Sequence, residues 1–232
     1  MTLFGSPGSG KGTQAKLLLQ CLHWPHVSTG DMLRSHINAK DEIGHQAEQL
    51  IRSGKLVPDE LVNDLVKRRI AEPDSRSGVI LDGYPRTLNQ AQVLLDMMKQ
   101  TGFRPVVIHL MVDHEKIVAR LSGRRQCPVC GTLYNLATNP PKVDTVCDLD
   151  GAALVTRKDD DESVIRERLR EYDSQTVPLL TYFQKAGVRM IEMNGGTGSP
   201  EEIVRQICDR LAATGFIERS AVDCQSGVPR LV

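Results

Sequence analysis

The sequence predicts an α/β fold in which helices flank a parallel sheet. Apolar segments of strand length alternate with longer segments of helical periodicity, which is the order typical of strand–helix–strand units. A glycine-rich turn follows the first apolar segment and leads directly into a helix. Apolar residues make up 40% of the 232 residues and aromatic residues only 4%, so we expect an aliphatic core.

The expected elements follow one another in the order of such a fold. Strands are expected at residues 2–4, 26–29, 78–83, 106–112 and 188–193. Helices are expected at residues 10–20, 41–53, 59–72, 89–102, 115–123, 160–187 and 200–215. The first strand is shorter than the central strand of such a sheet normally is, so either the sheet tolerates a stub or the start codon was assigned late. Residues 217–232 have no clear period, and we expect a loose tail there.

Composition and charge exclude several classes of protein. The formal net charge is zero, whereas a protein that relies on contacts with nucleic-acid phosphates is usually basic. The longest nearly apolar run, at 106–112, is too short to cross a membrane. Gly5, Ser6 and Pro7 interrupt the N-terminus before the apolar region of a signal peptide could form. We therefore expect a cytoplasmic protein with no nucleic-acid or membrane partner.

The first glycine-rich turn, GSPGSGKG at 5–12, nearly matches a phosphate-binding P-loop. Gly5, Gly10 and Lys11 have the Walker A spacing, but Gly12 stands where a strict match needs Ser or Thr, and Thr13 comes one position later. Glycines let backbone N–H groups turn toward phosphate oxygens, and the start of the following helix favours anions. The alternative is a glycine-rich turn without a ligand.

Residues 124–158 lack periodicity and are rich in Cys, Pro, Gly, Asn and Asp. So long a structureless stretch inside a compact domain is usually functional or disordered. The spacing of Cys127, Cys130, Cys147 and Asp150 is close to that of a zinc ribbon, and zinc accepts a carboxylate ligand. Four protein ligands would close the site, so the metal would be structural. The alternatives are Asp148 as the fourth ligand, or three incidental cysteines.

Several motifs occur in an order that resembles the adenylate kinases. They are GKGT (10–13), STGDMLR (28–34), GKLVPDELV (54–62), LDGYPRTLNQA (81–91), RLSGRRQCPVCG (120–131) and TRKDDDESVIRERLREY (156–172). The chain is identified as a member of the long-lid, zinc-containing type, and the resemblance covers about residues 1–213. It implies one kinase chain with a P-loop NTPase-like parallel sheet. The core would comprise 1–27, 58–122 and 161–213, with a helical insertion that binds the nucleoside monophosphate (NMP) at 28–57 and a zinc-bearing lid at 123–160.

The resemblance implies the reversible transfer of the terminal phosphate of MgATP to AMP, giving two ADP, in adenine nucleotide homeostasis. Because the phosphate of AMP is already an anion at neutral pH, the protein has to neutralise charge, align the reactants and exclude water. This predicts many arginines, whose planar fork suits phosphate, and few catalytic carboxylates. The catalytic residues implied are Lys11, Arg86, Arg124, Arg157 and Arg168.

The same resemblance assigns the remaining site residues. ATP would contact Gly8, Ser9, Gly10, Lys11, Gly12, Thr13, Arg120, Arg124, Leu133 and Tyr134. AMP would contact Thr29, Arg34, Lys55, Leu56, Val57, Gly83, Tyr84, Pro85, Arg86, Gln90, Arg157 and Arg168, with Gln90 on the adenine edge. Asp82 would orient Mg²⁺ through water, unless it is a turn or cap residue. Asp159 and Asp160 would orient arginines or lock the lid.

The implied cofactors are Mg²⁺ with ATP and a structural Zn²⁺, and the implied state is a monomer. Three alternatives stay open. The acceptor could be UMP, CMP or GMP, although the long lid and Gln90 favour AMP. A zinc-ribbon ATPase or switch that binds nucleic acid is disfavoured by the zero net charge. A nucleotide-binding protein without catalysis is disfavoured by the set of arginines.

Overall fold

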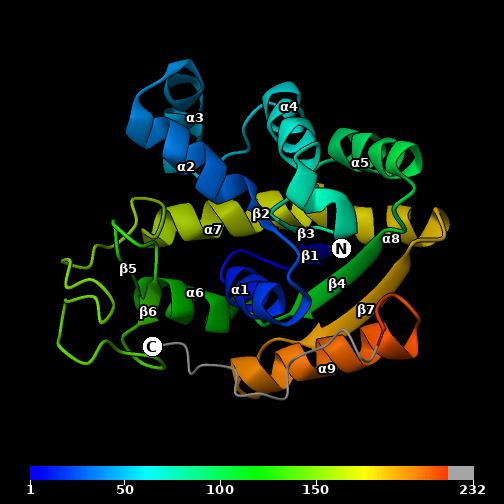
Figure 1. The fold of residues 1–232 in the computed structure, drawn as a ribbon. Helices are drawn as coiled ribbons and strands as arrows, with labels where there is room; N and C mark the ends of the chain where they lie inside the picture. The colour runs from blue at the N-terminus through cyan, green and yellow to red at the C-terminus, as the bar shows by residue number, and fades with distance from the viewer. Residues whose placement is uncertain (219–232) are drawn as a thin grey trace.

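The computed structural model describes residues 1–218, which form a five-stranded parallel sheet with helices on both faces (Figure 1). The strand order is β2-β3-β1-β4-β7. The strands are β1 (Thr2–Phe4), β2 (His26–Ser28), β3 (Ile80–Asp82), β4 (Val106–Met111) and β7 (Arg189–Asn194). The expected α/β fold is confirmed.

β1 is the short central strand that the sequence predicts. Its residues pair in parallel with β3 on one side and with β4 on the other, as Leu3 does with Asp82 and Ile108. The N–H of Leu81 also donates to the carbonyl of Met1, which extends the pairing by one residue. The strand leads directly into the glycine-rich loop at the carboxyl ends of its neighbours.

Two layers of apolar packing cover the sheet. On one face lie α1 (Lys11–Leu22) and α9 (Pro200–Ala213), and on the other lie α4 (Asp59–Ile70), α5 (Leu88–Thr101) and α8 (Pro178–Lys185). Successive strand residues alternate between the layers, since Leu3 belongs to the first and Phe4 to the second. A smaller cluster joins α6 (His114–Ser122) to α7 (Glu162–Glu171), and a short 3₁₀ helix at Pro73–Ser77 precedes β3.

The uninterrupted helix expected at 160–187 is wrong. α7 ends at Glu171, a π-helical segment spans Tyr172–Thr176, and α8 begins at Pro178. Pro178 has no N–H to donate, so regular helical bonding cannot pass through it. The N–H of Val177 instead reaches back five residues to the carbonyl of Tyr172 at 2.9 Å.

The elements expected individually do not include α2 (Thr29–Ala39), and Thr29 was expected in a strand, although the family resemblance implied a helical insertion at 28–57. Its signal was present, because Ser28 caps the helix by accepting from the N–H of Asp31. α2 packs closely on α3 (Glu42–Arg52), and a Cβ on Gly44 would lie only 2.2 Å from the carbonyl oxygen of His36. The pair stands together at the upper left of Figure 1.

The segment expected to lack structure, 124–158, contains a short antiparallel hairpin of β5 (Arg124–Gln126) and β6 (Leu133–Asn135). Strands of three residues are too short to show alternation in the sequence. A small cluster of Cys127, Tyr134 and Cys147 packs inside this segment, apart from the main core.

Part of the expected tail packs on the molecule, because Ile217, like Phe216, lies against the layer formed by α1 and α9. The remainder of the tail expected at 217–232, from residue 219 on, lies outside the described residues. Within residues 1–218, no helix combines the length and the apolar character that a membrane span requires.

Candidate active site

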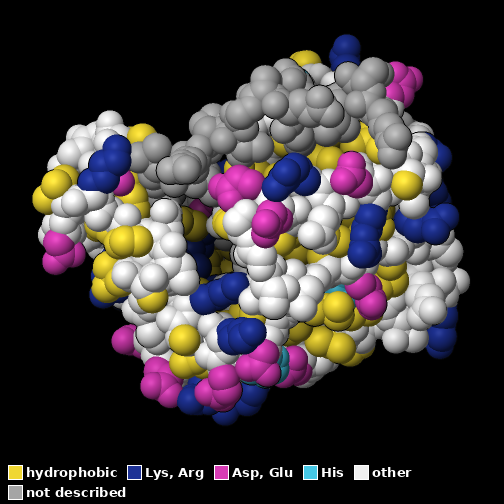
Figure 2. Space-filling view, turned by 90° about the horizontal axis from the view of Figure 1, so that it is seen from below, with side chains coloured by type: hydrophobic (Ala, Val, Ile, Leu, Met, Phe, Trp, Pro, Cys, Tyr) yellow, Lys and Arg dark blue, Asp and Glu magenta, His cyan; other side chains and the backbone are white. Residues whose placement is uncertain are grey.

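A cavity of about 2010 Å³ opens at the carboxyl ends of the strands. The glycine-rich loop, α2, the hairpin segment and α7 all contribute to its walls. Figure 2 shows this hollow between the smaller lobe, which carries the hairpin, and the main body. The edge of a parallel sheet at which the strands end is the usual ligand site of such folds.

The glycine-rich loop wraps around the side chain of Lys11. Its Nζ donates to the carbonyls of Gly5 at 2.7 Å and Ser6 at 2.9 Å. Gly5 has a φ of +147°, and a Cβ there would lie 2.5 Å from Ser9 Oγ, so only glycine fits. Gly10 caps α1 without a side-chain hydrogen bond, which leaves the first N–H groups of the helix for an anion.

Burial lowers the pKa of Lys11 to about 8, although Asp82 opposes the shift. The nearby guanidinium groups of Arg86, Arg168 and Arg124 lower it further. The ammonium therefore lies in a desolvated, cation-rich environment. An anionic ligand would restore its preference for the charged form.

Asp82 ends β3 beside the loop. Its Oδ2 lies 3.4 Å from His26 Nε2 and 3.4 Å from the position that a Cβ on Gly12 would take. Burial alone would raise the pKa of Asp82, but the contact with His26 and the charge of Lys11 outweigh it and hold that pKa below its usual value. The carboxylate of Asp82 therefore stays ionised where it lines the cavity.

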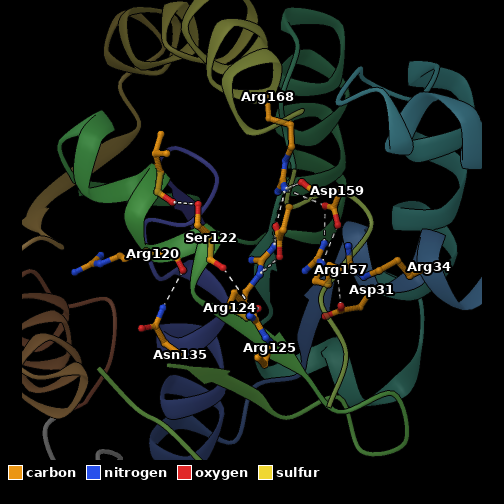
Figure 3. Close-up of polar contacts among 12 residues, drawn as sticks. Asp31, Arg34, Arg120, Ser122, Arg124, Arg125, Asn135, Arg157, Asp159 and Arg168 are labelled. Atoms are coloured by element: carbon orange, nitrogen blue, oxygen red, sulfur yellow. Dashed lines mark hydrogen bonds and ion pairs between the residues drawn. The ribbon is translucent and has the colours of Figure 1, made fainter. Parts of the chain in front are cut away.

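Two arginines share the carboxylate of Asp159 (Figure 3). Arg157 donates through Nε at 3.0 Å and through Nη2 at 2.8 Å, which is the bidentate geometry. Arg168 Nη1 lies 2.9 Å from Asp159 Oδ2 and also donates to the Asp159 carbonyl at 3.0 Å. Burial would raise the pKa of Asp159, but Arg168 and Arg157 hold it well below its usual range.

Asp160 binds the guanidinium group of Arg124 through both of its carboxylate oxygens. Arg124 Nε donates to Asp160 Oδ2 at 2.8 Å, and its Nη2 contacts Oδ1. Burial, followed by repulsion from Arg157, lowers the pKa of Arg124 from its ordinary high value. The expectation that Asp159 and Asp160 orient arginines agrees with these contacts.

A second group of polar residues lies around Gly83. Its carbonyl accepts from Thr29 Oγ1 at 2.9 Å and from Arg86 Nε at 2.9 Å. Its φ is +78°, and a Cβ would lie 2.8 Å from the Arg86 guanidinium, so the turn requires glycine. Thr176, in the π-helical segment, donates to the Arg86 carbonyl at 3.0 Å. Arg34 pairs with Asp31 one turn along α2.

Gln90 is buried and does not line the cavity. Its Nε2 donates to Asp59 Oδ1 at 2.7 Å, and its Oε1 accepts from the N–H of Arg86 at 2.8 Å. Its amide is thus held by Asp59 and by the backbone of Arg86, a residue that does line the cavity. Asp59 was not among the residues that the sequence analysis singled out.

At the opposite end of the cavity, Arg120 Nη1 donates to the carbonyl of Gly195 at 3.0 Å. The amide of Asn135 on β6 donates to the Arg120 carbonyl at 2.8 Å, which links the hairpin to α6. Leu133 and Tyr134 border the cavity from the hairpin. The Tyr134 side chain is buried, and its hydroxyl accepts from the N–H of Asp148 at 2.8 Å.

Ligand atoms of Cys127, Cys130, Cys147 and Asp150 all lie within 4.8 Å of one another. The sulfurs of Cys130 and Cys147 are 3.6 Å apart, and Cys127 Sγ is 3.2 Å from Asp150 Oδ2. A tetrahedral zinc site with bonds of about 2.3 Å places its sulfurs about 3.8 Å apart. The donor set and spacing therefore fit zinc. Asp148 Oδ1 instead accepts from the N–H of Lys142 at 2.9 Å.

The structure brings most of the predicted nucleotide-binding residues to one cavity. Those that line it are Gly8, Ser9, Gly10, Lys11, Gly12, Thr13, Arg34, Leu56, Asp82, Gly83, Pro85, Arg86, Arg120, Arg124, Leu133, Tyr134, Arg157 and Arg168. Those that do not are Thr29, Lys55, Val57, Tyr84 and Gln90. Val57 and Tyr84 are buried in the core layer formed with α4 and α5, and Lys55 is exposed.

Three polar residues that hold the site together were missed: His26 beside Asp82, Thr176 on Arg86, and Asp59 on Gln90. The sequence PDEL at 58–61 is a helix-start signal, which accounts for Asp59 as a first-turn acid without reference to Gln90. No spacing in the sequence joins the other two to their partners, because those contacts are made across the sheet or between separate segments.

A parallel sheet, a phosphate-binding loop and a cavity lined by arginines define a P-loop kinase. A family model described as adenylate kinase matches residues 3–188. The chain therefore belongs to the adenylate kinase family, whose reaction is the reversible transfer of a phosphate between ATP and AMP, giving ADP.

Similar proteins cover most of this chain. It is 46% identical over 196 residues to the adenylate kinase of Thermosipho africanus, covering 84% of this chain and 91% of that protein. It is 47% identical over 188 residues to the adenylate kinase of Clostridium acetobutylicum, covering 80% and 87%. It is 41% identical over 212 residues to the adenylate kinase of Finegoldia magna, covering 91% and 98%.

Proposed function

We propose that the two ends of the cavity divide the reaction between donor and acceptor. The glycine-rich loop, Arg120 and the hairpin segment bind MgATP, and Arg34, Arg86 and the α2–α3 pair bind AMP. Lys11, Arg124, Arg157 and Arg168 then neutralise the phosphate that passes between them. The observation that carries this proposal is the convergence of cations on one cavity. Lys11, Arg124, Arg157 and Arg168 reach it from four separate segments.

The arginines act by charge and position, because the attacking phosphate oxygen of AMP needs no strong base. In the described structure Arg124, Arg157 and Arg168 rest on Asp159 and Asp160. These carboxylates hold the guanidinium groups in place while the cavity is open. They also lessen the repulsion between neighbouring cations until a phosphate arrives.

The chain is proposed to work as one kinase unit with two moving parts. Residues 28–57 form the insertion that closes over AMP, and residues 123–160 form the lid that closes over ATP, both on the core of 1–27, 58–122 and 161–213. Closure would expel water from the reacting phosphates, and opening would release the products. The separate small core of the lid supports this division.

Magnesium bound with ATP would neutralise phosphate charge, and Asp82 is placed to hold its water ligands. Zinc, held by the three cysteines and Asp150, would stiffen a lid that buries few apolar residues of its own. We further propose that the enzyme is a cytoplasmic monomer that serves adenine nucleotide homeostasis. One chain supplies both ends of the cavity, and the metal-site thiols need a reducing compartment.

ADP formation from MgATP and each nucleoside monophosphate in turn tests the proposal. A strong preference for AMP over UMP, CMP and GMP is expected, and Arg168→Lys should lower kcat because an ammonium cannot replace the planar fork. The matched control is Arg170→Lys. Arg170 is an exposed arginine two residues further along α7, and it pairs with Glu167 outside the cavity. Equal activity with several monophosphates would overturn the assignment of AMP.

A further inference from the structure

Asp59, the first residue of α4, binds two side chains at the start of α5, the N-cap residue Thr87 and Gln90 in the first turn. Its Oδ1 accepts from Gln90 Nε2 and its Oδ2 accepts from Thr87 Oγ1, both at 2.7 Å. One turn further along α4, Asn63 donates to Asn89 at 3.2 Å and accepts from the Tyr84 hydroxyl at 2.6 Å. One edge of α4 therefore holds Tyr84 and the start of α5 in place.

These contacts allow only one orientation of the Gln90 amide. A carboxylate only accepts, so the NH₂ group of Gln90 has to face Asp59. The backbone N–H of Arg86 only donates, so Gln90 Oε1 has to face Arg86. A flipped amide would set oxygen against carboxylate and NH₂ against N–H. One N–H and one oxygen lone pair of Gln90 remain for a ligand, each at a fixed place.

A fixed amide can distinguish two kinds of purine. Adenine presents a donor at the 6-amino group and an acceptor at N1, whereas a 6-oxopurine presents an acceptor at O6 and a donor at N1. An amide that flips freely would pair with either edge. We propose that Asp59 is a specificity-determining residue, which selects adenine over 6-oxopurines in the acceptor by locking the Gln90 amide. This inference rests on the proposed function, in which Gln90 faces the base of AMP.

The test compares kcat/KM for AMP and for IMP, with MgATP as donor, in the wild type and in Asp59→Asn. IMP differs from AMP only at the 6-oxo group and N1, so size plays little part. An asparagine can offer either an oxygen or an NH₂ group to Gln90. We expect the wild type to prefer AMP by at least about 100-fold, and the AMP/IMP ratio of Asp59→Asn to fall by about tenfold. KM for ATP should not change.

The matched control is Glu60→Gln, which removes a negative charge from the same first turn of α4 at an exposed position. Glu60→Gln should keep the wild-type AMP/IMP ratio of kcat/KM. The ratio is measured on one preparation, so it does not depend on the fraction of active enzyme. If Asp59→Asn does not fold, Asp59→Ser takes its place, because a hydroxyl donates as readily as it accepts.

The outcomes separate this inference from the function on which it rests. A wild type that does not phosphorylate AMP refutes the proposed function. A wild type that uses AMP and IMP equally, or an Asp59 variant that keeps the wild-type ratio, refutes the lock alone. Equal losses with AMP and IMP would mean that Asp59 only stabilises the start of α5, which also refutes the lock. A ratio that falls in the Asp59 variant and not in Glu60→Gln supports it.

Discussion

Lys11 gives activity and stability opposite dependences on pH. Because burial lowers its pKa to about 8, the free enzyme loses this charge as the pH rises through that value. We expect kcat/KM for ATP to fall above pH 8, since this parameter reports groups of the free enzyme. In the unfolded chain Lys11 has its ordinary pKa of 10.5, so between pH 8 and pH 10.5 the unfolded chain binds this proton more tightly than the folded chain does. This group therefore makes the free energy of unfolding rise with pH in that range. A kcat/KM profile that stays flat from pH 7 to about pH 9.5 would contradict the assignment.

Asp159 holds two partly buried guanidinium groups, so its loss leaves both without their main partner. We expect Asp159→Asn to lower the free energy of unfolding by about 3 kcal/mol, because removing one partner of an ion pair leaves uncompensated charge largely shielded from water. Sulfate should recover part of the melting temperature by replacing the missing negative charge. Thermal denaturation with and without sulfate measures both effects. The control is Glu162→Gln, which breaks the exposed pair with Arg166 and should change stability by under about 0.5 kcal/mol. Equal effects of the two substitutions would refute the special role of Asp159.

At the scale of elements, the π-helical segment between α7 and α8 contacts the part of the cavity wall that we propose binds AMP. Thr176 donates to the carbonyl of Arg86, whose side chain lines the cavity. We expect Thr176→Val to raise KM for AMP several-fold, to leave KM for ATP unchanged and to cost about 1 kcal/mol of stability. The control is Ser174→Ala. Ser174 lies in the same π-helical segment, and its exposed hydroxyl donates to the carbonyl of Glu171. An equal rise of both KM values would show that the segment only supports the fold.

Elements that depend on local pattern were predictable from the sequence. The five strands of the main sheet and the glycine-rich loop followed from apolar runs and from glycine spacing, and the candidate metal ligands followed from two pairs at two-residue separation. Pro178 signals a helix break in the sequence. Because the residues on both sides have helical periodicity, one continuous helix was predicted instead. α2 is absent from the expected elements, although Met32, Leu33 and Ile37 give it an apolar face that packs on the core and Ser28 caps its first turn.

Contacts between distant segments could not be predicted in the same way. Asp59 and Gln90 are 31 positions apart, and Thr176 and Arg86 are 90 apart. No periodicity relates such pairs, so only the folded chain reveals them. The motif resemblance named Gln90 and Arg86 as ligand-facing residues, but it did not indicate what holds them. The supporting residues of a site are therefore the part that sequence reasoning misses first.

At the scale of the whole molecule, the segment proposed as the lid, residues 123–160, has its own small core. Cys127, Tyr134 and Cys147 pack together with Ala152 and Leu154, apart from the layers that cover the sheet. Several apolar side chains of this segment are exposed instead, including Val129, Val143 and Leu149. So small an apolar cluster cannot stabilise a lobe of this size by burial alone, and a metal bound by four side chains can supply what is missing.

Removing the metal should therefore affect stability far more than catalysis. Chelation of the purified protein is expected to lower its melting temperature by about 10 °C or more, because metal-binding free energy is folding free energy for such a segment. At temperatures where the chelated protein stays folded, kcat should remain within about twofold, since a metal held by Cys127, Cys130, Cys147 and Asp150 would have four protein ligands and no coordination position for substrate. Calorimetry and ADP formation on the same samples, before chelation and after zinc is added back, measure both. Asp150→Asn should reproduce the loss of stability and Asp148→Asn should not. A chelated protein that kept its melting temperature but lost its activity would show that the metal takes part in catalysis.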